Sequence, residues 1–90
     1  MNETYSSKVR NIIEWYGRIP SFQETENGWQ LVIYPGRLSE NLYLATLLNA
    51  LVEHDLPYHY KNYPLENAQS IEMSDDDYAT LVLLGVAIVE

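Results

Sequence analysis

The chain has 90 residues, of which thirteen are acidic and five are basic, so its formal net charge at pH 7 is −8. A chain of this length forms one domain with one modest hydrophobic core, and we expect that domain to span residues 1–90. Cysteine is absent, which excludes a disulfide framework, a thiolate metal site and a cysteine nucleophile.

The sequence gives no sign of a targeting or membrane segment. Its first residues contain no apolar stretch of the kind found in signal peptides. The longest apolar run, residues 78–89, is interrupted by Thr80 and Gly85 and falls short of the roughly 20 residues that span a bilayer. We therefore expect a soluble, cytoplasmic protein.

The negative charge is concentrated in the C-terminal half. Up to Arg37 four basic residues balance four acidic ones, whereas from Leu38 onward Lys61 is the only basic residue against nine acidic ones. This half repels the phosphates of nucleic acids and attracts basic protein surfaces. The alternative is that the acidic residues serve only to keep the protein soluble.

Residues 5–16 are predicted to form an amphipathic helix. Apolar side chains recur at helical spacing, at Tyr5, Val9, Ile12, Ile13 and Tyr16. Thr4, Ser6 or Ser7 is suited to cap the start of this helix, and Gly17 is suited to end it in a left-handed conformation.

Residues 18–34 are predicted to form a β-hairpin. Asn27-Gly28 is a favoured pair for a tight turn with positive φ, and residues 29–34 are rich in strand-forming side chains. The first arm, residues 19–25, contains Pro20, which suits an edge strand.

Residues 38–55 are predicted to form a central, mostly buried helix, with Ser39 as its N-cap. Its buried face is expected to contain Leu44, Leu47, Leu48, Leu51 and Val52. Thr46, Asn49 and Glu53 are expected to form a polar stripe that faces the solvent.

After Pro57 the sequence is predicted to return to β structure. Residues 58–63 contain three tyrosines and read as a strand, because aromatic side chains favour strands. Residues 64–70 are polar and are predicted to be a loop, and residues 71–73 are predicted to be a short strand.

A third helix is predicted to begin after Ser74, which is its expected N-cap. Residues 75–77 are all aspartate and place three carboxylates at the positive end of the helix dipole. Gly85 is expected to end this helix and to leave residues 86–89 as a last strand. The alternative is one long buried strand over residues 81–89, which are rich in strand formers.

Together these elements predict an α+β fold. The sheet is expected to be small and mainly antiparallel, with the central helix packed on one face and two shorter helices flanking it. No internal repeat, low-complexity tract or flexible linker interrupts the chain.

The sequence contains no arrangement typical of a catalytic or metal site. His54, Asp55 and His59 are the only candidate metal cluster, and Pro57 separates the two histidines, so their spacing matches no standard zinc motif. The serines lie in no nucleophile elbow, and the glycines form no phosphate-binding loop. We therefore expect no enzyme activity and no bound cofactor or metal.

Tyrosine is frequent in this chain, with eight copies beside two tryptophans. Tyrosine combines apolar area with a hydroxyl group, which suits protein interfaces. One interpretation is an aromatic patch with an acidic rim, formed by Tyr58, Tyr60, Tyr63, Glu53, Asp55 and Glu66. The other is a tyrosine-rich strand that packs on a helix and points its hydroxyls to water.

The leading functional hypothesis is the non-enzymatic binding of a basic protein partner. The candidate binding residues are Asp75, Asp76, Asp77, Glu72, Glu66, Glu53, Asp55, Tyr58, Tyr60 and Tyr63. A small acidic domain can inhibit an enzyme by occupying its nucleic-acid-binding groove, as phage counter-defence proteins do; this is an analogy of size and charge. The alternatives are a structural or regulatory subunit, which associates with partners or with itself through Tyr and Leu surfaces, and a small-molecule binder.

Overall fold

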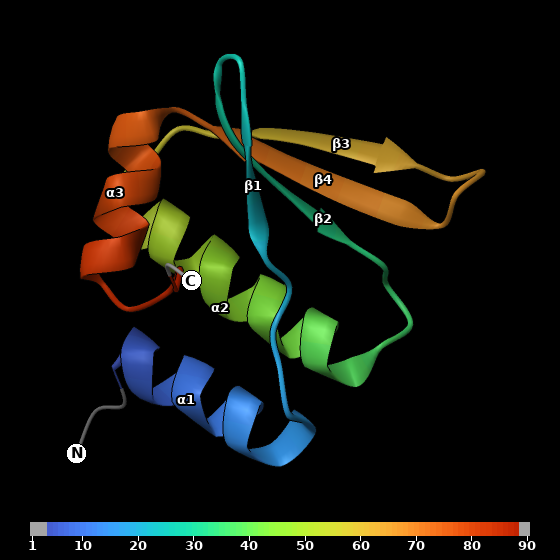
Figure 1. Ribbon diagram of the computed structural model, residues 1–90, viewed down its shortest axis with the longest axis vertical. Coiled ribbons are helices and arrows are strands. Elements are labelled where there is room, and N and C mark those ends of the chain that lie inside the picture. The colour runs from blue at the N-terminus through green and yellow to red at the C-terminus, as the bar shows by residue number, and fades with distance from the viewer. Residues whose placement is uncertain (1–3, 89–90) are drawn as a thin grey trace.

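A four-stranded antiparallel sheet and three helices make up the computed structural model, which describes residues 4–88 (Figure 1). In chain order the elements are α1 (Tyr5–Tyr16), β1 (Phe22–Thr25), β2 (Gly28–Ile33), α2 (Leu38–Glu53), β3 (His59–Tyr63), β4 (Ala68–Met73) and α3 (Asp75–Leu83). The strand order in space is β1-β2-β4-β3. The α+β architecture predicted from the sequence, with a central helix on one face, is confirmed.

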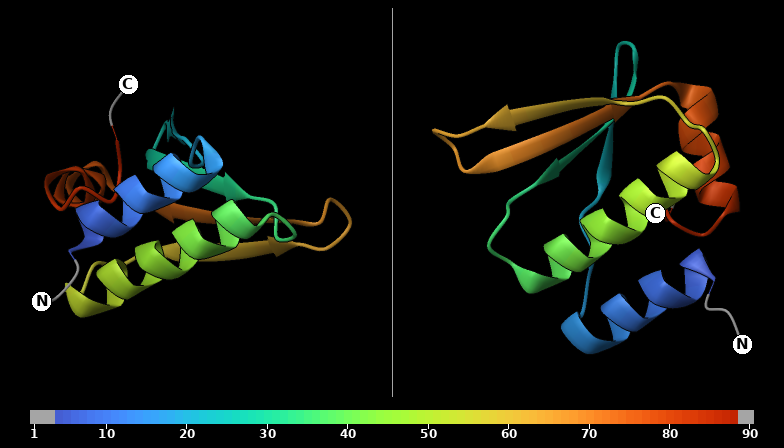
Figure 2. Two further views of the ribbon diagram at one scale, coloured as in Figure 1. Left: turned by 90° about the horizontal axis from the view of Figure 1, so that it is seen from below. Right: turned by 180° about the vertical axis from the view of Figure 1, so that it is seen from behind.

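The helices lie on one side of the sheet (Figures 1 and 2). α2 crosses that face, and α1 packs against the side of α2 that is turned away from the sheet. α3 stands at the end of the sheet where β2 begins and β4 ends, in contact with β2. Within the described residues no helix crosses the opposite face, which we call the outer face. None of the described helices is long and apolar enough to cross a membrane.

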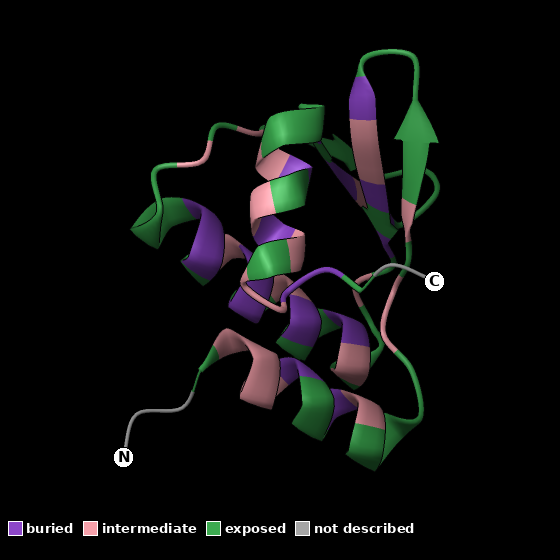
Figure 3. Ribbon diagram, turned by 60° about the vertical axis from the view of Figure 1, so that its left-hand side comes forward, coloured by how far each residue is buried: buried purple, intermediate pink, exposed green. Residues whose placement is uncertain are grey.

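The hydrophobic core fills the space between the sheet and α2 and continues to α1 (Figure 3). Successive residues of a strand point to opposite faces, so every second residue of the two inner strands is buried against α2. The fully or nearly fully buried side chains include Leu31, Ile33, Ile71, Met73, Tyr43, Leu47, Leu51, Val9 and Ile12.

The first helix begins and ends as predicted. The Thr4 hydroxyl oxygen accepts a hydrogen bond from the N–H of Ser7 at 3.2 Å and so caps α1. Gly17 has a φ of 88°, and its N–H donates to the carbonyl of Ile13 at 2.7 Å. This left-handed glycine ends the helix.

The predicted hairpin is present, but its turn lies one residue earlier than expected. Thr25 pairs with Gly28, so the two turn residues are Glu26 and Asn27, and Asn27 is not in a positive-φ conformation. Gly28 instead opens β2, where a Cβ atom would lie 2.1 Å from the carbonyl oxygen of Met73 in β4. The glycine is therefore required by the close approach of two strands.

The N-cap of helix α2 lies two residues earlier than predicted, and the helix is rotated relative to the predicted orientation. Its N-cap is Arg37, and Ser39 lies in the first turn, so the predicted cap is wrong. Thr46 is buried and its hydroxyl donates to the carbonyl of Leu42 at 3.1 Å, whereas Val52 is 68% exposed. The predicted buried face was wrong at these two positions because α2 contacts both the sheet and α1.

The C-terminal third contains two further corrections. β4 begins at Ala68, within the predicted loop, and is an inner strand between β2 and β3. Residues 86–88 form no strand; Val86 and Ala87 are buried after the turn at Gly85, and Val86 accepts a hydrogen bond from the Tyr43 hydroxyl at 2.6 Å. Val89 lies outside the described residues.

Candidate protein-binding surface

The predicted acidic helix start is present at the end of β4. The Ser74 hydroxyl oxygen accepts from the N–H of Asp77 at 3.3 Å, and the hydroxyl donates to the Asp77 carboxylate at 2.9 Å. Asp75 and Asp76 are exposed in the same first turn of α3. Asp77 therefore belongs to the helix cap, while Asp75 and Asp76 are free to face a partner.

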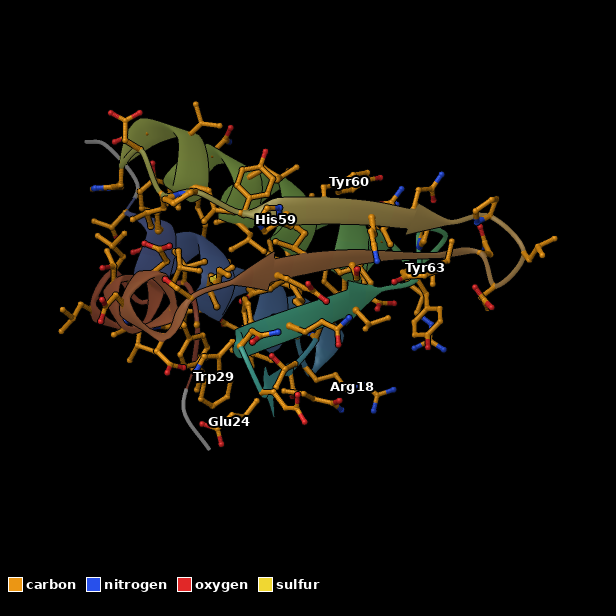
Figure 4. All side chains as sticks on the ribbon, turned by 90° about the horizontal axis from the view of Figure 1, so that it is seen from above. Arg18, Glu24, Trp29, His59, Tyr60 and Tyr63 are labelled. Atoms are coloured by element: carbon orange, nitrogen blue, oxygen red, sulfur yellow. The ribbon has the colours of Figure 1, made fainter. Side chains whose placement is uncertain are left out.

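A hollow of about 520 Å³ adjoins this helix start. The β1–β2 turn rises above the outer face on one side of it, and the start of β3 lies on the other side, with the end of β4 between them (Figures 1 and 4). We call this hollow the acidic cleft; its lining residues are Thr25, Glu26, Asn27, Trp29, Pro57, His59, Glu72, Met73 and Ser74. Two carboxylates and no lysine or arginine line it.

Strand pairing fixes the positions of the lining groups. His59 is opposite Glu72 across β3 and β4, and Trp29 is opposite Met73 across β2 and β4. Figure 4 shows His59 and Trp29 on opposite sides of β4. By this register the exposed carboxylate of Glu72 shares the outer face with His59, whereas Trp29 and Met73 project to the face that carries the core.

Aromatic stacking ties the cleft to α3. The rings of Trp29 and Tyr78 stack with centroids 4.0 Å apart and an interplanar angle of 10°. Phe22 meets the same tyrosine edge-on at 5.2 Å. Burial raises the pKa of Tyr78, so its hydroxyl stays neutral at physiological pH. These contacts hold the acidic turn of α3 beside the start of β2.

The carboxylates of this surface form no salt bridge with the described residues of the chain. Residues 4–88 contain one ion pair, in which Nε of Arg37 lies 3.6 Å from Oε2 of Glu40. Glu26, Glu72, Asp75 and Asp76 are all exposed and none of them takes part in it. Their field is not cancelled by an internal partner.

The predicted aromatic patch does not form as one surface. Tyr60 pairs with Ile71, whose side chain is in the core, whereas Tyr63 pairs with Ala68 on the other face. Tyr58 is half-buried and packs against the core. Side chains alternate across a strand, so a patch that combined Tyr60 with Tyr63 was not possible on this register.

The three acidic residues of the predicted rim, Glu53, Asp55 and Glu66, lie away from the acidic cleft. Glu66 is in the turn between β3 and β4, at the far end of that hairpin. Glu53 ends α2, and its carboxylate accepts a hydrogen bond from the Tyr5 hydroxyl, which raises the pKa of Tyr5. Asp55 follows α2 with a φ of 54° and is exposed. The structure therefore gathers Glu72 and Asp75–Asp77 but separates the other three acids from them.

The candidate metal ligands are not brought together. His54 lies edge-on to the ring of Tyr5, with the centroids 6.1 Å apart, while His59 lines the acidic cleft on β3. Among residues 4–88 there is no group of three histidine, aspartate or glutamate side chains with the geometry to hold a metal ion.

The sequence did not point to Glu26 and Trp29 as residues of this surface. The hairpin signal at Asn27-Gly28 placed Glu26 near a turn. This turn lies beside the end of β4, and so lines the cleft, only because β2 pairs with β4. That pairing joins segments about 40 residues apart, which local sequence patterns do not specify.

Comparisons of the chain with protein-family models, with curated proteins and with solved structures gave no match. The functional interpretation therefore depends on the geometry and charge of this chain.

Proposed function

We propose that this protein is a non-enzymatic binding module that takes a basic surface of a partner protein into its acidic cleft. The observation that carries the proposal is the set of carboxylates without an internal cation around one hollow, Glu26 and Glu72 in its lining and Asp75 and Asp76 beside it. A lysine or arginine side chain of the partner supplies the missing positive charge.

Two physical effects support this mode of binding. An unbalanced negative field steers a cationic partner toward the surface and disfavours neutral or acidic ones. Within the cleft, the planar guanidinium of an arginine matches a carboxylate in geometry and can form two parallel hydrogen bonds with it. Arginine is therefore the preferred residue of the partner.

Occupation of a nucleic-acid-binding groove on an enzyme is the form of binding that this charge favours. Such grooves are lined with basic residues, and an acidic protein competes with the nucleic acid for them. We propose an inhibitor of this type, acting in the cytoplasm, where a chain without cysteine suits the reducing conditions. Phage counter-defence proteins are the analogy for this role.

The test is capture of partners from the native host with matched charge variants. Glu26→Gln with Glu72→Gln removes two charges from the cleft and leaves the Ser74 cap intact. Glu14→Gln with Glu66→Gln removes two charges from exposed positions on α1 and at the far hairpin tip. Capture is repeated at high salt, because the screening length falls from about 10 Å at 0.1 M to about 3 Å at 1 M.

The proposal predicts that the wild type and the Glu14/Glu66 variant retain the same basic protein at low salt. The Glu26/Glu72 variant is expected to lose it, and high salt is expected to release it from all variants. Equal capture by both double variants, or capture that tolerates high salt, would contradict the proposal.

A second candidate is association between copies through the sheet edge. β3 is an edge strand in which four of the five residues are exposed, and such edges pair with other strands. Light scattering on the purified protein decides between the two: a dimer that tolerates high salt favours the second candidate, and a monomer at all salt concentrations removes it.

A further inference from the structure

The edge strand β3 and one flank of α2 lie along the same side of the molecule and present a surface without charge (Figures 2 and 4). We call it the α2–β3 face; its residues are Asn41, Leu44, Ala45 and Leu48 on α2 and Tyr60 and Asn62 on β3. None of these residues is charged, although the chain carries a net charge of −8. A second copy of so acidic a chain meets the least repulsion at a face of this kind.

Helix α2 is almost free of charge on its exposed side. Its two charged residues are Glu40, which is buried, and Glu53, whose carboxylate accepts a hydrogen bond from Tyr5 of α1. This bond places α1 on the flank of α2 that carries Glu53. Since successive residues of a helix are about 100° apart, Leu44 and Leu48 lie on the other flank, where both are half-buried.

Tyr60 continues this surface to the edge of the sheet. It is opposite Ile71 of β4, whose side chain is in the core, so Tyr60 projects from the face of the sheet on which α2 lies. Its side chain is nevertheless 48% exposed, because β3 is the last strand of the sheet. An exposed tyrosine beside an unpaired strand edge is typical of a protein interface.

The two edges of the sheet differ in their protection against pairing. β1 follows Pro20, contains Glu24 and leads into Glu26, and prolines and charges at an edge hinder the addition of another strand. β3 contains no acidic residue, and Lys61 is its only lysine or arginine. Its free edge pairs with no other strand within residues 4–88. β3 is therefore the edge that is open to a further strand.

From these features we propose that a second copy of this chain occupies the α2–β3 face, with the β3 strands of the two copies paired antiparallel across a two-fold axis. The two four-stranded sheets then form one continuous sheet, and the flanks of both α2 helices lie on the same side of it. A two-fold contact is complementary to itself and closes at two copies. The inference rests on the second candidate function above and adds to it a face and a register.

Charge selects the register of the two strands. If Lys61 lay opposite itself, two like charges would face each other, which destabilises an antiparallel pair. If Tyr60 lies opposite itself, Lys61 faces His59 of the second copy instead. Glu72 is paired with His59 on the next strand and shares its outer face, so Lys61 approaches a carboxylate of the second copy. The two Tyr60 rings then meet at the axis.

The first test is the oligomeric state of the purified protein at several salt concentrations, measured by sedimentation equilibrium. Because each copy carries a net charge of −8, repulsion opposes the dimer, and salt screens that repulsion. We expect a dimer whose dissociation constant falls as the salt concentration rises. Binding by the acidic cleft is expected to weaken with salt, so the two proposals fail separately. A monomer at millimolar concentration at every salt concentration would overturn the dimer and leave the acidic cleft unaffected.

Single cysteines test the register, because the chain has no cysteine of its own. Tyr60→Cys brings two thiols together at the axis, where facing Cα atoms are about 4.5–5.5 Å apart, within the range of a disulfide. Leu65→Cys is the control: Leu65 is 99% exposed, but its two copies are on the order of 30 Å apart in this register. Mild oxidation is expected to cross-link only the first variant. Equal cross-linking of both, or none with Tyr60→Cys, would overturn the proposed register.

A charge placed on α2 tests the helical part of the face. Ala45→Glu adds a carboxylate at an exposed position of the face, and Ala79→Glu adds one at an exposed position of α3. Both variants keep good helix formers and add the same charge to the chain. Ala45→Glu is expected to raise the dissociation constant of the dimer about tenfold or more, and Ala79→Glu is expected to have little effect. Equal effects of the two variants would overturn the assignment of the dimer to this face.

Discussion

Gly28 stands where β2 passes closest to the end of β4. A Cβ atom at this position would lie 2.1 Å from the carbonyl oxygen of Met73, which is far inside the contact distance of real atoms. Gly36 has the same φ of 148° but meets nothing within 4 Å. Substitution of either glycine therefore introduces backbone strain, but only substitution of Gly28 also introduces steric overlap.

We predict that Gly28→Ala lowers the free energy of unfolding by at least about 1 kcal/mol more than Gly36→Ala does, because overpacking adds to the strain. Urea denaturation of both variants measures the difference. Equal losses would mean that the strands at Gly28 separate more easily than the structure implies.

Tyr43 joins the C-terminal segment to the core through a buried hydrogen bond to the carbonyl of Val86. Burial raises the pKa of Tyr43 above its ordinary value of about 10. The neutral hydroxyl is therefore favoured in the folded state. The stability that it contributes is complete below about pH 10 and is lost as the pH rises toward the higher folded-state pKa.

Tyr43→Phe is predicted to lower the free energy of unfolding by about 1–3 kcal/mol near neutral pH, since the Val86 carbonyl loses its donor. The gap between the wild type and the variant is expected to shrink above about pH 10. Denaturation at several alkaline pH values tests this, and a gap that does not change with pH would contradict it.

At the scale of elements, α2 shows how packing on two sides selects the buried residues of a helix. Leu47 is fully buried, whereas Val52, in the same helix, is 68% exposed. We predict that Leu47→Ala lowers the free energy of unfolding by about 2–5 kcal/mol and that Val52→Ala changes it by less than about 0.5 kcal/mol. Similar losses, measured by thermal or chemical denaturation, would show that the helix is oriented differently.

The sequence was sufficient to predict the helices and the first hairpin because each carries its own local signal. Thr4 and Gly17 delimit α1, and Ser74 with the following aspartates marks the start of α3. β4 has no such signal: the segment around Ser70 is polar and reads as a loop. It becomes an inner strand through pairing with β2 and β3, which is a property of the whole sheet.

Of the candidate protein-binding surface, only the negative charge was predictable from the sequence. The aspartates of α3 and Glu72 were expected to act together, and the structure places them at one end of the sheet. Glu26 gave no signal in the sequence, because its position comes from a cleft that tertiary contacts create. Tyr60 and Tyr63 were grouped by their closeness along the chain, although strand geometry points them to opposite faces.

At the scale of the molecule, the charge is divided between two regions. The acidic cleft and the first turn of α3 carry carboxylates that form no salt bridge with the described residues, whereas Arg18 and Arg37 lie at the other end of β2. A molecule with such a polarity is oriented by the field of a charged partner before contact is made. We therefore expect the acidic region to act mainly on the rate of association.

The most direct test measures association rates with the basic partner captured by the wild type, at low and at high salt. Asp75→Asn with Asp76→Asn removes two charges beside the cleft and spares Asp77, which belongs to the cap. Glu14→Gln with Glu66→Gln is the matched control. We predict that the aspartate variant associates severalfold more slowly at low salt, that the control matches the wild type, and that high salt makes all three equal. If the aspartate variant keeps the wild-type rate and salt dependence, the acidic surface does not bind the partner, and the proposed function is wrong.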